Sequence, residues 1–251
     1  MYCFGSNRSE TMLHNTDGKG EGILNRKVLY VSSESGLGGA NRSLCDMLAY
    51  IKEYVNAIVV IPERGVLSSE LDRMNIIYYI VKLSKGFGKI GQHKQADEER
   101  DFLINYKAAT EIKKIIEKEK IDLVHINSSV CNAGAMGAIL AGIPYIWHIR
   151  EIPGKQFDCE FWDMPLKKML FCRTNKFLAI SKCVQEEYRQ NYGIASNKIY
   201  DGLDCKKYVQ SAKKEEEYSF LVAGATISEE KGQLDVIKAV KILNKKGIYC
   251  R

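Results

Sequence analysis

The residues with the clearest chemical potential are the glycines within residues 27–49, KVLYVSSESGLGGANRSLCDMLA. Residues 28–33 are rich in β-branched and aromatic types, which is typical of a strand, and apolar residues recur at helical spacing over residues 44–48. The turn Gly36-Leu37-Gly38-Gly39 lies between them. A strand that passes through glycines into a helix gathers unpaired backbone N–H groups at the positive end of the helix dipole. The stretch therefore predicts a phosphate or diphosphate site.

This glycine turn lacks the two best-known phosphate-binding motifs. Asn41 stands where the dinucleotide fingerprint G-x-G-x-x-G needs its third glycine, and the sequence has no G-x-x-x-x-G-K-[ST] segment. Asn41 therefore disfavours an NAD(P)-dependent oxidoreductase, which is one alternative function. Turns of the same kind also occur in parallel α/β domains that bind no phosphate, so the motif alone leaves both interpretations open.

The elements that would position this turn alternate between strands and helices. Strands are predicted over residues 28–33, 56–61, 76–81, 121–127, 144–149 and 176–180, and helices after the glycine turn and over residues 68–74, 106–120, 132–141, 161–172 and 181–191. Residues 86–101 are polar and predict a mobile surface loop. The alternation requires right-handed crossovers, so it predicts a Rossmann-like, doubly wound, mostly parallel sheet with ligands at the carboxyl edge of its strands.

A second, incomplete α/β unit is predicted at the end of the chain. The predicted units are a disordered or non-native lead-in over residues 1–26, a complete sheet domain over 27–204, a charged linker over 205–218 and the start of a second domain over 219–251. The last unit would comprise a strand over residues 220–224, a helix over 228–246 and another strand from residue 248. The inner face of that helix would consist of Leu234, Ile237, Val240 and Leu243.

Composition narrows the class of protein without naming a function. The net charge of +6 suits an anionic ligand or an anionic membrane surface, but it is far from the dense basic clustering of a nucleic-acid binder. The eight cysteines are scattered without a C-x-x-C pair, which favours buried thiols in a reducing compartment. No secretory signal or long apolar run is present, so we expect a cytoplasmic protein.

Four segments, in this order, resemble the GT-B glycosyltransferases of family 4, the glycosyl transferases group 1 type. They are SGLGGANRSLCDML, DLVHINSSVCNAGAMGAILAGIPYIWHIRE, FLAISKCVQEEYRQNYGIASNKIYDGLD and SFLVAGATISEEKGQLDVIKAV. The resemblance implies two Rossmann-like domains that face each other across a cleft, with a nucleoside-diphosphate sugar bound mainly to the second. In this chain the second domain would be truncated.

On the donor side, the resemblance assigns Gly38 and Gly39 to a loop that approaches the diphosphate and the transferred sugar. A Cβ there would hold the backbone away from an anion. Lys231 matches the lysine of the family's G-R-x-x-x-x-K pattern, which neutralises the donor diphosphate; its alternative is a surface lysine offset by neighbouring acidic residues. Ala225 and Thr226 replace the Gly-Arg of that pattern, so donor binding would depend on Thr226, Lys231 and helix N–H groups.

Beside the reacting sugar, the resemblance assigns the catalytic role to His148, which ends the strand PYIWHI. We expect its side chain to face the cleft and the glycine turn. The alternative is a buried strand histidine, which is what the sequence predicts for His125. The predicted acceptor-side residues are Asn41, Asn127, Ser128 and Glu151.

The resemblance implies a glycosyltransferase that moves a sugar from a nucleoside-diphosphate sugar to a glycan or lipid-linked acceptor, in cell-surface polysaccharide synthesis. Transfer would retain the anomeric configuration and need no metal or other cofactor. The family's E-x7-E segment would lie beyond residue 251, so the chain alone is expected to be inactive. The alternative is a half-enzyme that acts as an acceptor-, membrane- or partner-binding module.

One amphipathic segment predicts a peripheral contact with the inner face of the plasma membrane. Residues 164–173 place Leu166, Met169 and Leu170 on one helical face, with Lys167 and two further basic residues around it. A helix of this kind can lie in an anionic lipid interface. The alternative is a helix packed on the sheet with a solvated basic rim.

Overall fold

The computed structural model describes residues 26–92, 94–154, 158–174, 176–203, 221–224, 227 and 231–249. Its strands are β1 Lys27–Val31, β2 Asn56–Ile61, β3 Ile77–Ile80, β4 Phe87–Lys89, β5 Leu123–Ile126, β6 Tyr145–Ile149, β7 Cys159–Phe161, β8 Phe177–Ala179 and β9 Asn197–Lys198. The helices are α1 Gly39–Ile51, α2 Val66–Arg73, α3 Gln95–Glu119, α4 Asn132–Ala141, α6 Met164–Cys172, α7 Lys182–Tyr192 and α8 Gln233–Lys245.

The main sheet of the described residues is parallel throughout, in the order β3-β2-β1-β5-β6-β8-β9. The predicted Rossmann-like, doubly wound α/β fold is therefore confirmed. From β1 the chain crosses to β2 on one side, and from β5 it crosses to β6 on the other. The loops that follow β1 and β5 consequently diverge, which is where doubly wound sheets bind their ligands.

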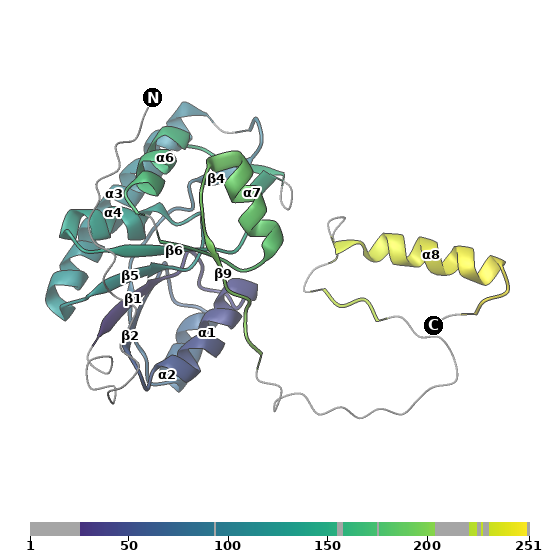
Figure 1. Ribbon diagram of the computed structural model, residues 1–251, viewed down its shortest axis with the longest axis horizontal. Coiled ribbons are helices and arrows are strands. Elements are labelled where there is room, and N and C mark those ends of the chain that lie inside the picture. The colour runs from purple at the N-terminus through teal and green to yellow at the C-terminus, as the bar shows by residue number, and fades with distance from the viewer. Residues whose placement is uncertain are drawn as a thin grey trace.

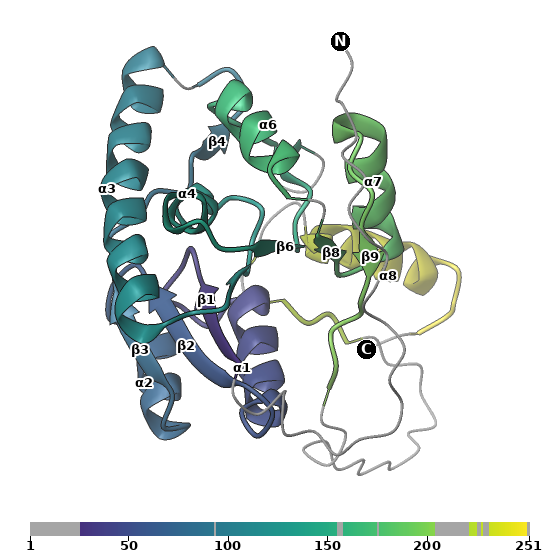
Figure 2. The ribbon, with the colours of Figure 1, turned by 60° about the vertical axis from the view of Figure 1, so that its left-hand side comes forward.

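Helices cover both faces of this sheet (Figures 1 and 2). Leucines of α1 and α2 pack in one core cluster with Tyr30 and Val59. Residues of α3, α4, α6 and α7 pack in a second cluster with Val31, Ile126 and Trp147 from the opposite face. Alternate residues of each strand thus feed the two cores, because neighbouring side chains of a strand point to opposite faces.

Helix α3 begins earlier than the sequence predicted. It starts at Gln95, so the predicted surface loop over residues 86–101 is wrong in its second half. The first turn is polar but well stabilised: the Asp97 carboxylate accepts the Lys94 backbone N–H at 3.2 Å and forms an ion pair with Arg100 at 3.0 Å. Acidic residues at a helix start also interact favourably with its dipole.

Two short strands close one end of the domain. β4 pairs antiparallel with β7, which replaces the helix start predicted at residue 161. The helix α6 begins instead at Met164, because the carboxylate of Asp163 caps it by accepting the Leu166 backbone N–H at 2.8 Å.

The last described segment contains the predicted helix but not its predicted packing. Within α8 no residue is buried, and Leu234 and Ile237 are 58% and 64% exposed. The predicted inner face is therefore wrong. Residues 221–224 and 248–249 form no strand, so the strand predictions fail for these described residues. Without strands of a second sheet, the apolar side of α8 has no surface to pack on in this part of the chain.

Helix α6 turns a different face inward from the predicted one. Its buried residues are Lys167, Leu170 and Phe171, whereas Met169 is 46% exposed. The predicted lipid-facing arrangement is therefore wrong, since Leu170 lies in the core and Lys167 is fully buried. A contact with the membrane stays a prediction, but this face of α6 cannot supply it. None of the helices in the described residues combines the length and apolarity needed to cross a bilayer.

Full burial of Lys167 is made tolerable by its surroundings. Its Nζ donates to the Ser129 carbonyl and to Asn132 Oδ1, each at 2.5 Å. The same atom lies 4.8, 4.5 and 5.5 Å from the ring centroids of Trp147, Phe161 and Phe171. Hydrogen bonds and aromatic faces favour the ammonium form, but burial outweighs them and lowers the pKa of Lys167 to about 7.

We predict that Lys167→Met abolishes a rise of stability with pH. In the unfolded chain the lysine stays protonated up to its ordinary pKa of 10.5, whereas in the folded chain it loses its proton near pH 7. The folded state is therefore favoured as pH rises through this window, by on the order of 4 kcal/mol. Urea unfolding from pH 7 to pH 10 measures the effect. Lys168→Met, at the exposed neighbour, is the matched control. Equal pH slopes for the parent and Lys167→Met would contradict the prediction.

Candidate functional site

A cleft of about 580 Å³ lies at the carboxyl edge of β1, β5 and β6. It is lined by residues from the loops after these strands, from the start of α1 and from the segments around Lys85 and Asp201. The predicted site residues on its wall are Gly38, Gly39, Asn41, Asn127, Ser128 and Glu151. Residues far apart in the sequence thus meet where the sheet topology reverses.

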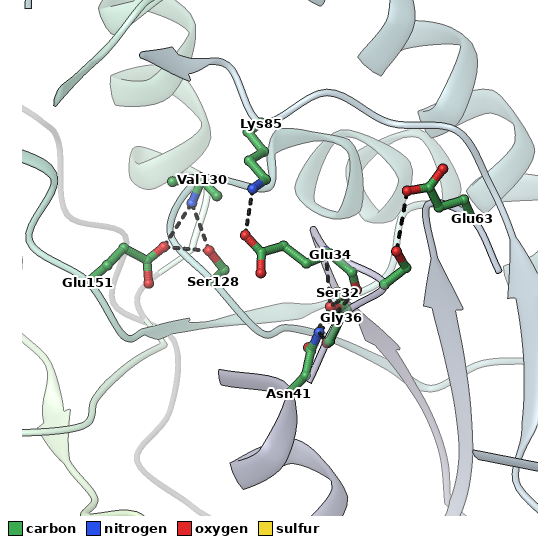
Figure 3. A network of polar contacts seen from close by, with 10 residues as sticks. Ser32, Glu34, Gly36, Asn41, Glu63, Lys85, Ser128, Val130 and Glu151 are labelled. Atoms are coloured by element: carbon green, nitrogen blue, oxygen red, sulfur yellow. Dashed lines mark hydrogen bonds and ion pairs between the residues drawn. The ribbon is translucent and has the colours of Figure 1, made fainter. Parts of the chain in front are cut away.

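The side chain of Asn41 stabilises the glycine turn by hydrogen bonds. Its Oδ1 accepts the Ser32 hydroxyl at 2.7 Å, and its Nδ2 donates to the carbonyls of Glu34 and Gly36 at 3.1 and 2.7 Å (Figure 3). The residue is 2% exposed, so its amide is engaged within the loop. Asparagine at the position of the third fingerprint glycine therefore fixes the turn by hydrogen bonds.

The glycines of this turn are not required by the chain's own packing. An added Cβ at Gly36 or Gly39 would meet nothing within 4 Å, and neither backbone lies in the left-handed region. At Gly38 the nearest atom would be Glu34 Oε2, at an ordinary contact distance of 3.6 Å. The open side of the turn faces the cleft, so glycine here leaves room for a molecule from outside the chain.

Arg150 is the buried cation of the site, with a side chain that is only 4% exposed. Its Nη1 donates to both carboxylate oxygens of Asp201, at 2.9 and 3.0 Å, and to Ser43 Oγ at 3.1 Å. Its Nε donates to Asn127 Oδ1 at 3.0 Å, and Asn127 in turn donates to the Ala40 carbonyl at 3.1 Å. Arg150 thereby ties β5, α1 and the segment after β9 together.

The neighbouring carboxylate of Glu151 is held by the turn that precedes α4. Its Oε1 accepts the Ser129 N–H and Oγ at 2.7 and 2.9 Å, the Val130 N–H at 3.3 Å and the Ser128 hydroxyl (Figure 3). Converging backbone N–H groups at a helix start suit an anion. In this structure the chain's own carboxylate takes that place.

His148 does not face the cleft, so the geometric part of its prediction is wrong. It is 4% exposed and is not among the residues that line the cleft. Its Nδ1 lies 3.2 Å from His125 Nε2 and 3.4 Å from Arg150 Nη2. Burial, and secondarily the Arg150 charge, lower the pKa of His148 to about 3, so its imidazole is neutral at pH 7. No third His, Cys, Asp or Glu of the described residues completes a metal site with this pair.

One predicted donor-side residue, Lys231, does not line this cleft. Lys231 is exposed and precedes Gly232, the N-cap of α8. Thr226 lies outside the described residues. The roles of both residues, and the catalytic role of His148, stay predictions.

Sequence reasoning missed Arg150, Asp201 and the ion pair between Glu34 and Lys85. A signal for Arg150 was present in the sequence, because Arg150 directly follows the apolar strand β6. The carboxyl end of β6 lies beside that of β5, which precedes Asn127. The Glu34–Lys85 contact joins loops after β1 and β3, which are separated by a strand, and no local pattern announces it.

A known protein family matches most of this sheet domain. The family model described as Glycosyltransferase Family 4 matches residues 37–205, more than half of the chain. A search of curated proteins gives no significant match.

Two solved structures share the fold at 18% sequence identity. A glycosyltransferase from Rickettsia africae has a TM-score of 0.63, with 90% of this chain and 59% of that chain covered. Anabaena HepE in complex with UDP-glucose has a TM-score of 0.54, with 87% and 50% covered. The chain thus spans about half the length of HepE.

We predict that Gly39→Ala changes the free energy of unfolding by no more than about 0.5 kcal/mol, because Gly39 is the first residue of α1 and the added methyl group meets open space. Gly137→Ala is the contrasting control: its Cβ would lie 2.5 Å from Ile112 Cγ2, so we expect a loss of about 1–3 kcal/mol. Urea unfolding measures both variants. A destabilised Gly39→Ala would mean that the chain itself needs this glycine.

Proposed function

The chain belongs to glycosyltransferase family 4, and on this premise we propose that it forms the acceptor-side part of a nucleotide-sugar glycosyltransferase. The sugar would pass from a nucleoside-diphosphate sugar to a glycan or lipid-linked acceptor in cell-surface polysaccharide synthesis. The observation that carries the proposal is the cleft at the switch point of the sheet, with glycines that the chain's own packing does not require. Family membership speaks against the NAD(P)-dependent alternative.

Within this cleft, we assign the acceptor to the side formed by Asn127, Ser128 and Glu151. Donors from Ser129 to Oε1 fix the Glu151 carboxylate, so Oε2, which accepts the Arg150 backbone N–H at 3.1 Å, can accept a hydroxyl without a change of conformation. Preorganised groups of this kind contribute to catalysis because they need no reorganisation during the reaction. Gly38 and Gly39 would let the donor sugar and diphosphate approach the backbone.

The experiment measures UDP released from UDP-glucose, the donor bound by HepE. The chain is assayed alone and together with a nucleotide-binding domain supplied from a family 4 relative. We expect release only in the mixture, and less of it with Gly39→Ala at unchanged stability. The absence of UDP release under both conditions would overturn the proposal that the chain is part of an enzyme. The alternative is an acceptor-, membrane- or partner-binding module, which would bind its ligand without UDP release.

We further propose transfer with retention of configuration and without metal or other cofactor. The coupling constant of the anomeric proton in the product, measured by NMR, reports the configuration. Turnover that persists in EDTA would support the absence of a metal requirement, and its complete loss, restored by magnesium, would contradict it.

For His148 we propose a neutral, hydrogen-bonding role, because burial keeps its imidazole uncharged. Its Nε2 has no hydrogen-bond partner in the described residues. We predict that His148→Ala lowers turnover in the mixture about a hundredfold through Arg150, whose Nη2 lies 3.4 Å from His148 Nδ1, because displacing a group that lines the cleft can cost that much. His125→Ala, which removes the other ring of the pair, is the control and should have the smaller effect. Melting temperatures show that both variants fold. Equal turnover in parent and His148→Ala would refute the role.

For Lys231 we propose contact with the donor diphosphate. Lys231→Ala should weaken UDP-glucose binding by about tenfold, because hydrogen bonds to charged groups contribute about 1.5–3 kcal/mol. Calorimetry with the mixture measures the affinity. Lys241→Ala, at an exposed lysine of α8, is the matched control. The assignment fails if the two variants bind the donor equally.

A further inference from the structure

An ion pair crosses the mouth of the cleft beside the glycine turn. Lys85 Nζ lies 2.5 Å from Glu34 Oε1, and the two side chains are 41% and 50% exposed (Figure 3). Glu34 belongs to the loop after β1 and Lys85 to the segment between β3 and β4, and both line the cleft. The pair is therefore reachable by a molecule that enters the cleft.

The position of Glu34 is set by the loop around it. The Glu34 carbonyl accepts a hydrogen bond from Asn41 Nδ2 at 3.1 Å, and the Glu34 backbone N–H donates to Ser32 Oγ at 3.3 Å. Lys85 holds one carboxylate oxygen, and the other, Oε2, is the nearest atom to a Cβ built on Gly38. A molecule bound against Gly38 would therefore lie within reach of this carboxylate oxygen.

The charges of the cleft wall leave no unpaired cation for an anionic ligand among the described residues. Of the side chains that line it, Lys85 is paired with Glu34 and Arg150 with Asp201. Glu151 adds a further carboxylate, which is held by hydroxyl and backbone N–H donors. An anionic group would thus have to compete with Glu34 for Lys85, whereas a hydroxyl could donate to the Glu34 carboxylate in a charge-assisted hydrogen bond.

We propose that Glu34 is a specificity-determining residue that binds hydroxyl groups of a neutral saccharide acceptor and disfavours acceptors that carry a carboxylate or phosphate at this position. Lys85 orients the carboxylate, and the ring of Phe87 on the same wall offers an apolar surface to a sugar ring. The inference rests on the proposed function, because it specifies the acceptor of that same cleft.

The test compares binding of matched probes to the whole chain by NMR titration. The probes are the methyl glycosides of glucose, galactose and mannose, each paired with its uronic acid, which differs by one carboxylate. We expect at least one neutral glycoside to bind about tenfold more tightly than its uronate, and Glu34→Gln to remove most of that preference. Lys85→Gln should retain it, since Glu34 keeps its charge.

Glu63→Gln is the matched control. Glu63 accepts a hydrogen bond from Ser35 at 3.3 Å on the adjacent loop and does not line the cleft, so the variant changes net charge equally without touching the wall (Figure 3). The Glu63→Gln variant should prefer the neutral glycoside to its uronate as strongly as the parent does. The proposal is overturned if no neutral glycoside binds, if uronates bind as well as neutral sugars, or if Glu34→Gln and Glu63→Gln act alike.

Donor turnover is measured separately, so the two proposals can fail independently. If UDP is released but neutral glycosides and uronates bind equally, only the role of Glu34 is refuted. Discrimination without UDP release under any condition would support Glu34 and overturn the enzymatic function.

Discussion

The buried charge of Arg150 is the constraint on which the cleft depends. An unpaired guanidinium at 4% exposure would be strongly destabilising, by several kcal/mol, so its partners must lie where the charge is. Those partners come from distant parts of the chain: Asn127 follows β5, Ser43 lies in α1 and Asp201 follows β9. Neutralising one charge therefore sets how closely the walls of the cleft approach each other.

A second buried basic side chain supports the same edge from the opposite face of the sheet. Lys167 donates to the carbonyl of Ser129, and the N–H and hydroxyl of Ser129 donate to Glu151. Arg150 and Glu151 are adjacent in sequence but are anchored by different helices and different cores. Since each anchor is a buried hydrogen-bond network, the segment that carries both residues is held on two sides, which gives a polar site a defined geometry.

The sequence predicted six of the seven strands of the main sheet, because each is a mostly apolar run of aliphatic and aromatic residues. It missed β9, whose residues Asn197 and Lys198 carry no such pattern. It predicted six wall residues of the cleft through a glycine turn and strand ends. It failed where charge was misleading: Lys167 was predicted to flank the apolar face of α6, at a lipid surface or alternatively on a solvated rim, because a lysine is rarely buried, and the polar start of α3 resembled a loop. It also placed His148 in the cleft, since strand ends are predictable but the neighbour that covers a side chain is not.

In the proposed glycosyltransferase, the pairing of charges on the cleft wall bears on where each of the two substrates binds. A nucleoside-diphosphate sugar carries negative charges that need cations or many N–H donors. Among the described residues this cleft pairs its own cations with its own carboxylates, and only the start of α1 presents free N–H groups beside Gly38. Hydroxyl-rich molecules, by contrast, find carboxylates, serines and amides that are already fixed. Under the proposed function, the electrostatics of this domain favour the acceptor, and the charge of the donor would be met chiefly by groups outside this wall.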